Sequence, residues 1–172
     1  MTENPPVLTV ERLREVIDYD PATGVFRWRI SRPGCVAGRR AGAIKNDGYR
    51  QIEIDRRLYR GARLAFLYMT GSWPRPGAIV DHRNRVRDDD RWSNLREATL
   101  AQNARNRGLC RRNTSGRIGV SPIAGGAKWN ADIGIGGRNI HLGRFKDKAD
   151  AIAARDAAER RHYGDFAAMS RR

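Results

Sequence analysis

The sequence predicts an α+β protein of two modules: a strand–strand–helix (ββα) module within residues 1–112, and a three-stranded antiparallel sheet packed on one helix within residues 113–172. Between residues 78 and 106, a strand, a polar loop, a second short strand and a helix follow one another. After residue 113, three short strands joined by Gly-rich turns precede one long helix. A chain of 172 residues can bury one moderate core or two small ones, so its length allows both modules.

The N-terminal elements are predicted from capping and turn residues. Thr9 is a suitable N-cap, and Leu13, Val16 and Ile17 fall on one face of the helix that it would begin. Gly71 ends a short buried helix further on. The remaining elements expected before residue 78 are a turn at 20–24, a strand at 25–29, a Gly/Arg-rich loop at 31–47, a hairpin at 49–60 and that helix at 62–69.

The ββα segment begins with an apolar strand at 78–80, which delivers Asp81 and His82 at its end. Residues 83–91 are almost all charged or amide side chains, so we expect a solvated loop there. A second short strand lies near Asn94. Thr99 then opens a helix, with Gln102 completing a capping box. Asn103, Asn106 and Arg107 share one face of that helix.

The C-terminal segment predicts strands at 117–121, 128–135 and 139–142. Asp147 is expected to cap a helix that runs to about residue 162, where Gly164 stops it. The predicted apolar stripe of this helix consists of Ala149, Ile152, Ala153 and Ala157, whose mostly small side chains would let it lie close to the sheet.

Positive charge dominates the composition. The formal net charge is +15 and the sequence pI is about 11.1. Such an excess costs self-repulsion unless a polyanion neutralises it, and counterion release makes nucleic acid the natural partner. An anionic membrane would require large apolar residues opposite the basic face of a helix, and the last helix carries mostly alanines there. We therefore expect double-stranded DNA as the partner and no membrane association.

Cysteine usage and the N-terminus indicate a cytoplasmic protein. Cys35 and Cys110 are too few and too isolated for a zinc knuckle or a disulfide framework, and free thiols suit a reducing compartment. The N-terminus has no basic-then-apolar signal, and no apolar run approaches membrane-spanning length. If a phage encodes the chain, this compartment would be the host cytoplasm.

The candidate catalytic constellation consists of three short pieces, Asp81-His82, Asn94-Leu95-Arg96 and Gln102-Asn103. His82 can take a proton from water, and Asn94 is a polar, uncharged side chain suited to orient its ring. Asp81 and Asn103 offer oxygen ligands, which suit Mg²⁺ or Mn²⁺ better than zinc. The pattern predicts hydrolysis of a phosphodiester assisted by one divalent cation, with no small-molecule cofactor.

These pieces resemble the HNH endonuclease family, specifically the phage-type homing endonucleases with an H-N-N ending. The resemblance covers Leu8 to about Asn106 and includes Tyr19-Asp20-Pro21-Ala22-Thr23-Gly24, Arg63-Leu64-Ala65, Gly71-Ser72-Trp73-Pro74 and Arg91-Trp92-Ser93. It implies a ββα-metal nuclease module in which Asp81 and Asn103 hold the metal. It also implies that His82 is the general base and that Asn94 positions it.

Two positions depart from the family pattern. Ala62 and Asp90 stand where members usually have histidine and asparagine, so activity could be reduced or lost if those residues support the site. The run Asp88-Asp89-Asp90 could be a second metal cluster, but a solvated loop tip is the preferred interpretation.

A second resemblance is carried by residues 113–121, 128–133 and 141–145, with Gly164-Asp165-Phe166-Ala167 at the end. These segments look like the Apetala/ethylene-response-factor DNA-binding domain. The resemblance implies a three-stranded sheet, backed by one helix, whose open face enters the major groove, and alternate side chains of a twisted sheet can reach base edges there. The positions that match DNA contacts are Arg117, Ser121, Lys128, Trp129, Arg138, His141 and Arg144.

Two of these residues and the connector allow other readings. Trp129 could be a core residue as readily as a groove contact. His141 has no cysteine or second histidine at ligand spacing, so a phosphate contact or a surface role is preferred to metal binding. The basic connector, Arg105, Arg107, Arg111 and Arg112, could contact phosphates and add affinity without specificity.

Together these features predict a phage-type homing endonuclease that nicks one strand of DNA and acts as a monomer, because one constellation breaks one strand per engagement. The alternative is a DNA-binding regulator on a nuclease scaffold that cuts weakly or not at all. RNA binding is a weaker alternative, since the A-form major groove is too narrow for a sheet.

Overall fold

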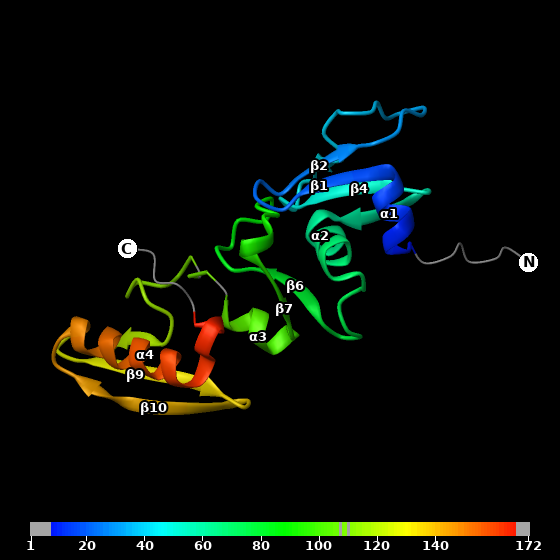
Figure 1. Ribbon diagram of the computed structural model, residues 1–172. Coiled ribbons are helices and arrows are strands. Elements are labelled where there is room, and N and C mark those ends of the chain that lie inside the picture. The colour runs from blue at the N-terminus through cyan, green and yellow to red at the C-terminus, as the bar shows by residue number, and fades with distance from the viewer. Residues whose placement is uncertain (1–7, 107, 110, 168–172) are drawn as a thin grey trace, which may run out of the picture. The chain divides into compact units, whose positions relative to one another are not determined.

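The computed structural model of the chain describes residues 8–106, 108–109 and 111–167 (Figure 1). The chain divides into two compact units, Met1–Leu100 and Ala101–Arg172. The helix that carries Asn103 therefore belongs to the second unit, ahead of the module boundary expected near residue 113. Arg107 and Cys110, both named above, lie outside the described residues. The secondary structure confirms a mixed α+β protein.

The first unit opens with helix α1 (Val10–Val16), which begins at the predicted cap, because Thr9 Oγ1 accepts a hydrogen bond of 3.2 Å from Arg12 N. Ile17 was predicted on this helix but begins strand β1 (Ile17–Asp20). Burial alternates along β1, with Ile17 and Tyr19 buried, as expected for a strand whose side chains point alternately to opposite faces. Strand β1 forms an antiparallel hairpin with β2 (Val25–Trp28).

A three-stranded antiparallel sheet follows, in the order β3 (Ala43–Ile44), β4 (Arg50–Ile54) and β5 (Arg57–Arg60). The predicted hairpin is confirmed, whereas β3 lies in a segment that was expected to be a loop. Helix α2 (Gly61–Thr70) ends at Gly71, whose positive φ of 78° matches the expected stop. The core of this unit joins these elements through completely buried residues that include Leu13, Phe26, Ile52, Ile54 and Leu64.

Strands β6 (Ile79–His82) and β7 (Leu95–Ala98) form an antiparallel pair. A 3₁₀ turn, η1 (Trp92–Asn94), leads into β7. In this pair Asp81 lies opposite Arg96, and His82 lies opposite Leu95. The strand, loop and second strand predicted around His82 are therefore present.

The second unit begins within the short helix α3 (Leu100–Arg105), whose first residue belongs to the first unit. It contains a sheet in the order β10 (Arg138–Phe145), β9 (Trp129–Ile135) and β8 (Val120–Pro122). Helix α4 (Lys148–Tyr163) packs on one face of this sheet and is followed by the 3₁₀ turn η2 (Gly164–Phe166) (Figure 1). A small core forms around Val120, Ala131 and Ala151. None of the helices in the described ranges combines the length and apolar character needed to cross a membrane.

The face of α4 that meets the sheet differs from the prediction. Its buried residues are Ala151, Arg155, Glu159 and Tyr163, whereas Ala149, Ala153 and Ala157, predicted to form the apolar stripe, are exposed. The i, i+4 spacing of the buried set defines one helical face, and two of its members carry opposite charges. Asp147 occupies the N-cap position, but its side chain makes no capping hydrogen bond.

Candidate active site and nucleic-acid interface

The end of β6 places a histidine against a buried carboxylate. His82 Nε2 lies 3.0 Å from Asp90 Oδ1, and the two side chains are only 5% and 2% exposed. The expectation that residues 88–90 form a solvated loop tip is therefore wrong for Asp90. In the tautomer in which Nε2 donates to this carboxylate, Nδ1 is the ring nitrogen that can accept a proton.

Asp90 is held from two sides. The Tyr19 hydroxyl donates a 2.7 Å hydrogen bond to the Asp90 carbonyl oxygen. Burial, and then the nearby charge of Asp90, raise the pKa of Tyr19, so its hydroxyl remains a donor at neutral pH. A Cβ at Gly61, the first residue of α2, would overlap Asp90 Oδ2. The carboxylate therefore fits only because position 61 has no side chain.

The β1–β2 hairpin braces the same backbone. Trp92 N donates a 3.0 Å hydrogen bond to the Pro21 carbonyl oxygen. At the tip of the hairpin, Gly24 has a φ of +73°, and a Cβ there would overlap the backbone where Asp90 joins Arg91. A side chain at position 24 would be excluded both by its own conformation and by this contact.

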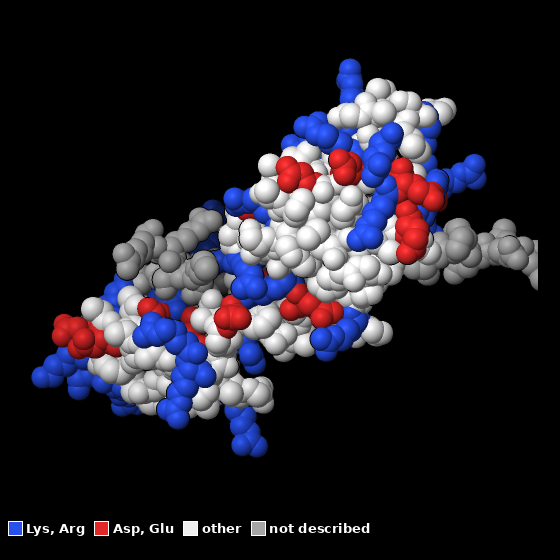
Figure 2. Space-filling view, in the orientation of Figure 1, with Lys and Arg blue, Asp and Glu red and all other residues white. Residues whose placement is uncertain are grey.

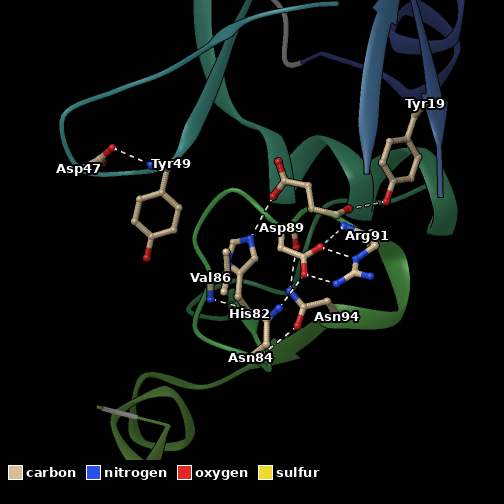
Figure 3. Close-up of polar contacts among 10 residues, drawn as sticks. Tyr19, Asp47, Tyr49, His82, Asn84, Val86, Asp89, Arg91 and Asn94 are labelled. Atoms are coloured by element: carbon tan, nitrogen blue, oxygen red, sulfur yellow. Dashed lines mark hydrogen bonds and ion pairs between the residues drawn. The ribbon is translucent and has the colours of Figure 1, made fainter. Parts of the chain in front are cut away.

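Asn94 acts on the loop rather than on the ring. Its Oδ1 accepts a 3.0 Å hydrogen bond from Asn84 N, and its Nδ2 donates a 2.7 Å hydrogen bond to the Asp89 carbonyl oxygen (Figure 3). Asn94 was expected to orient the His82 ring, but the residue at Nε2 is Asp90. Asn94 instead fixes the backbone of the residue before Asp90, so its effect on His82 is indirect.

Asp89 closes this loop with charged hydrogen bonds. It accepts from Arg91 Nε and Nη2 at 2.7 and 2.6 Å, and from Asn84 Nδ2 at 2.6 Å (Figure 3). The bonds from Arg91, followed by the one from Asn84, lower the pKa of Asp89 to about 2. The loop that positions Asp90 is therefore tied by an ionised carboxylate.

We expect Asp89→Asn to lower the free energy of unfolding by about 1 kcal/mol at pH 6. A carboxyl whose pKa is depressed in the folded state contributes stability above its ordinary pKa of about 3.9 and loses it as the pH falls toward the folded value. Urea unfolding of wild type and variant should therefore differ at pH 6 and converge as the pH falls from about 4 to about 2. An equal difference at both ends of this range would show that the ionised state is unimportant.

The candidate metal ligand Asp81 is buried beside an arginine. Its Oδ2 accepts hydrogen bonds from Arg96 Nε and Nη2 at 2.9 and 2.8 Å, and the two side chains are 6% and 7% exposed. Among the described residues, no group of three or more His, Cys, Asp or Glu could hold a metal ion. The carboxylate of Asp81 and the amide of Asn103 fit a hard divalent cation in the kind of donor they offer. Arg96 already donates to one of these oxygens, Oδ2 of Asp81.

The sheet of the second unit has two distinct faces. Register places Ser121, Asn130, Asp132, His141 and Arg144 on the face away from α4, and Val120, Trp129, Ala131 and Ile133 on the face toward it. Of the predicted DNA contacts, Ser121, His141 and Arg144 are thus on the open face. Trp129 is half-buried against the small core, which favours the packing role over the groove contact.

The other predicted contacts have varied surroundings. Lys128, Arg138, Arg111 and Arg112 are exposed. His141 Nδ1 lies 2.9 Å from Asp132 Oδ1. Arg105 lies 4.6 Å above the centre of the Tyr163 ring. Neither Asp132 nor Tyr163 was predicted from the sequence to take part in this surface.

Arg117 requires a correction. Its guanidinium donates to Asp156 Oδ1 at 2.7 Å and to Glu159 Oε2 at 2.6 Å, and the residue is only 8% exposed. Glu159 also pairs with Arg155 at 2.9 Å. Arg117 therefore neutralises buried carboxylates of α4 instead of facing the groove, because the first predicted strand begins only at Val120.

The positive charge is unevenly divided. Residues 1–100 contain 19 Lys and Arg against 13 Asp and Glu, and residues 101–172 contain 15 against 6. Lys and Arg side chains lie on the visible face of each unit (Figure 2). The second unit is the more basic for its length, which suits a polyanionic partner.

Comparison with known families bears on this site. Residues 62–105 match the HNH endonuclease family model. The match covers about a quarter of the chain, runs from α2 to α3, and includes Asp81, His82, Asn94 and Asn103. It supports a nuclease. No curated protein and no solved structure matches the chain.

Proposed function

We propose that this protein is a metal-dependent DNA endonuclease of the phage homing type, which hydrolyses a phosphodiester and nicks one strand per engagement as a monomer. The proposal is carried by one observation: the segment that matches the HNH endonuclease family contains a strand ending in His82, whose ring is held by a buried carboxylate. The basic charge of both units supports DNA as the substrate.

His82 is the general base of this proposal. Asp90 holds Nε2, so Nδ1 takes the proton from the attacking water, and the water oxygen forms a bond to phosphorus while the bond to the 3′ oxygen breaks. The imidazolium that forms is stabilised by the charge of Asp90. Asn94 contributes by holding the loop that ends in Asp90.

Asp81 and Asn103 are the proposed holders of Mg²⁺ or Mn²⁺. The family match includes both residues and supports this assignment. When bound, a divalent cation neutralises charge that develops on the phosphate and on the leaving oxygen. Arg96 holds the Asp81 carboxylate in place through their ion pair.

The C-terminal sheet is proposed to anchor the enzyme on duplex DNA through its open face, in the manner of an Apetala/ethylene-response-factor domain. Ser121, His141 and Arg144 are the contacts that the register supports. Lys128, Arg138 and the connector residues Arg105, Arg111 and Arg112 would add phosphate contacts. Arg107, which lies outside the described residues, keeps its sequence-based assignment.

The test is nicking of supercoiled plasmid at low salt with Mg²⁺ or Mn²⁺. We expect wild type to convert the plasmid to the open circle, and we expect chelator to abolish this conversion. His82→Ala, purified in the same way, controls for a contaminating nuclease, because equal nicking by both proteins would assign the activity to the preparation.

A DNA-binding regulator that no longer cuts is the second candidate. The observation that favours it is the Asp81–Arg96 ion pair, because Arg96 already neutralises the carboxylate that a cation would need. A plasmid that is shifted on a gel but never nicked, with either cation and with candidate target sites inserted, would support this candidate.

Asn is the residue that members of the resembled family usually have at position 90, so Asp90→Asn tests whether this chain depends on the charge of the carboxylate instead. We expect the variant to lower the single-turnover rate of nicking by about 10- to 100-fold while DNA affinity stays unchanged. The amide keeps the shape and an acceptor for His82 Nε2, but it lacks the charge that stabilises the imidazolium. Gly61→Ala is the steric counterpart, because its Cβ displaces the carboxylate without removing the charge. Wild-type rates in both variants would restrict Asp90 to a structural role.

A further inference from the structure

Three segments of the first unit bring two arginines onto one tyrosine ring beside His82. The Cζ atoms of Arg60 and Arg87 lie 4.2 and 5.4 Å from the centre of the Tyr49 ring. The centre of that ring is 5.9 Å from the centre of the His82 ring. Together with Asp47, which contacts all three, Tyr49, Arg60 and Arg87 form the Tyr49 cluster.

The turn before β4 builds this cluster. Gly48 has a φ of +80°, and its N donates a 2.7 Å hydrogen bond to the Lys45 carbonyl oxygen. Asp47 Oδ1 accepts from Tyr49 N at 3.2 Å, and Asp47 Oδ2 pairs with Arg60 Nη2 at 3.3 Å. Arg87 Nη1 donates to the Asp47 carbonyl oxygen at 2.8 Å. The arginines are therefore positioned before any ligand arrives.

The cluster has unused capacity for an anion. It holds two guanidinium groups against one carboxylate, so the arginines repel each other across a shared ring. Arg87 is exposed and the Arg60 side chain is 50% exposed, so both keep N–H donors facing water. The Tyr49 hydroxyl makes no hydrogen bond with any described residue, and its end of the ring points away from the turn (Figure 3).

A role restricted to fixing the turn explains less of this arrangement. The contacts of Asp47 with Tyr49 and Arg87 already tie the turn to the loop. The guanidinium of Arg60 pairs with the Asp47 carboxylate rather than with the backbone of the turn, and it adds repulsion with the guanidinium of Arg87 on the same ring. A bound phosphate would relieve that repulsion and accept hydrogen bonds from both arginines and from the tyrosine.

We propose that the Tyr49 cluster binds a backbone phosphate of the cleaved DNA strand, next to the scissile phosphate at His82. This assignment rests on the proposed nuclease function. The centres of the Tyr49 and His82 rings are 5.9 Å apart, which is less than two nucleotide steps at about 3.4 Å each along one strand, so the two groups can face neighbouring phosphates. Such a contact sets the position of the scissile bond and carries no sequence information.

The test measures DNA binding separately from cleavage. In a His82→Ala background, the affinity for a fixed duplex is measured over a range of salt concentrations. Arg60→Ala and Arg87→Ala should each reduce the slope of log K against log salt by about 1. Arg63→Ala is the matched control: it is also exposed and also lies over an aromatic ring, that of Trp73, and should leave the slope unchanged.

Position on the strand is tested with the active protein. Duplexes that carry one neutral methylphosphonate are scanned across the mapped nick. Neutralising one flanking phosphate should slow wild type, whereas Arg87→Ala should be equally slow with and without that modification. If each methylphosphonate slows nicking by wild type and by Arg87→Ala by the same factor at every position, the proposal is wrong.

The outcomes also separate this inference from the function on which it rests. If Arg60→Ala and Arg87→Ala reduce the salt slope but wild type does not nick DNA, the cluster binds a phosphate, and both the nuclease function and the position beside the scissile bond are refuted. Slopes equal to that of Arg63→Ala, with nicking intact, would overturn the Tyr49 cluster alone. Tyr49→Phe, which removes only the hydroxyl, should weaken binding without lowering the melting temperature.

Discussion

Replacing His82 with alanine is expected to lower the rate of plasmid nicking by about 10³-fold or more while changing the affinity for duplex DNA by less than about two-fold. The imidazole is the proposed acceptor of the proton from water, and its removal leaves no comparable base at the end of β6. The ring is 5% exposed, so it contributes little surface for DNA to contact. Single-turnover nicking, with binding measured separately, gives both quantities.

Stability must be controlled in that experiment, because the alanine leaves Asp90 buried without its ring partner. His82→Gln keeps a side-chain donor for Asp90 but is a far weaker base. We expect it to melt closer to wild type and to be equally inactive. If His82→Gln nicks at the wild-type rate, His82 is not the general base.

Arg117→Ala is expected to lower the free energy of unfolding of the second unit by about 3 kcal/mol. The substitution removes one partner of a buried ion-pair network and leaves the carboxylates of Asp156 and Glu159 with less compensation. Glu159 retains Arg155, which limits the loss. Hydrogen exchange of the amides in β9 and β10 would measure this opening locally.

Arg144→Ala provides the matched control. Arg144 is exposed on the open face of the sheet, so its loss should weaken DNA binding and reduce the salt slope by about 1 without changing amide exchange. Arg117→Ala should show the opposite pattern at temperatures where the unit stays folded. A stable Arg117→Ala protein with weakened DNA binding would restore the groove contact that the sequence predicts for this residue.

Local signals in the sequence predicted much of the fold. Thr9 begins its helix and Gly71 ends another because caps depend on a few neighbouring atoms. The strand that ends in Asp81 and His82 was also found, since a short apolar run followed by polar residues is a local pattern. The match to HNH endonucleases covers this strand.

What the sequence did not reveal depends on contacts between distant residues. Asp90 looked like the end of a solvated acidic run, but contacts with Tyr19 and Gly61, far away in sequence, help to bury it. Similarly, the alanines of α4 do not identify the face that packs on the sheet. Glu159 can be buried on that face because Arg117, which lies outside the helix, pairs with it. Favourable burial of charge depends on partners that a periodicity argument does not identify.

The hairpin β1–β2 limits how far this protein can be shortened. Residues 62–105 carry the nuclease match, yet Tyr19, Pro21 and Gly24 contact the backbone from Asp90 to Trp92 from outside that segment. A fragment that starts at α2 would keep every proposed catalytic residue and lose this support. A fragment designed to keep the proposed nuclease site therefore has to include the first hairpin.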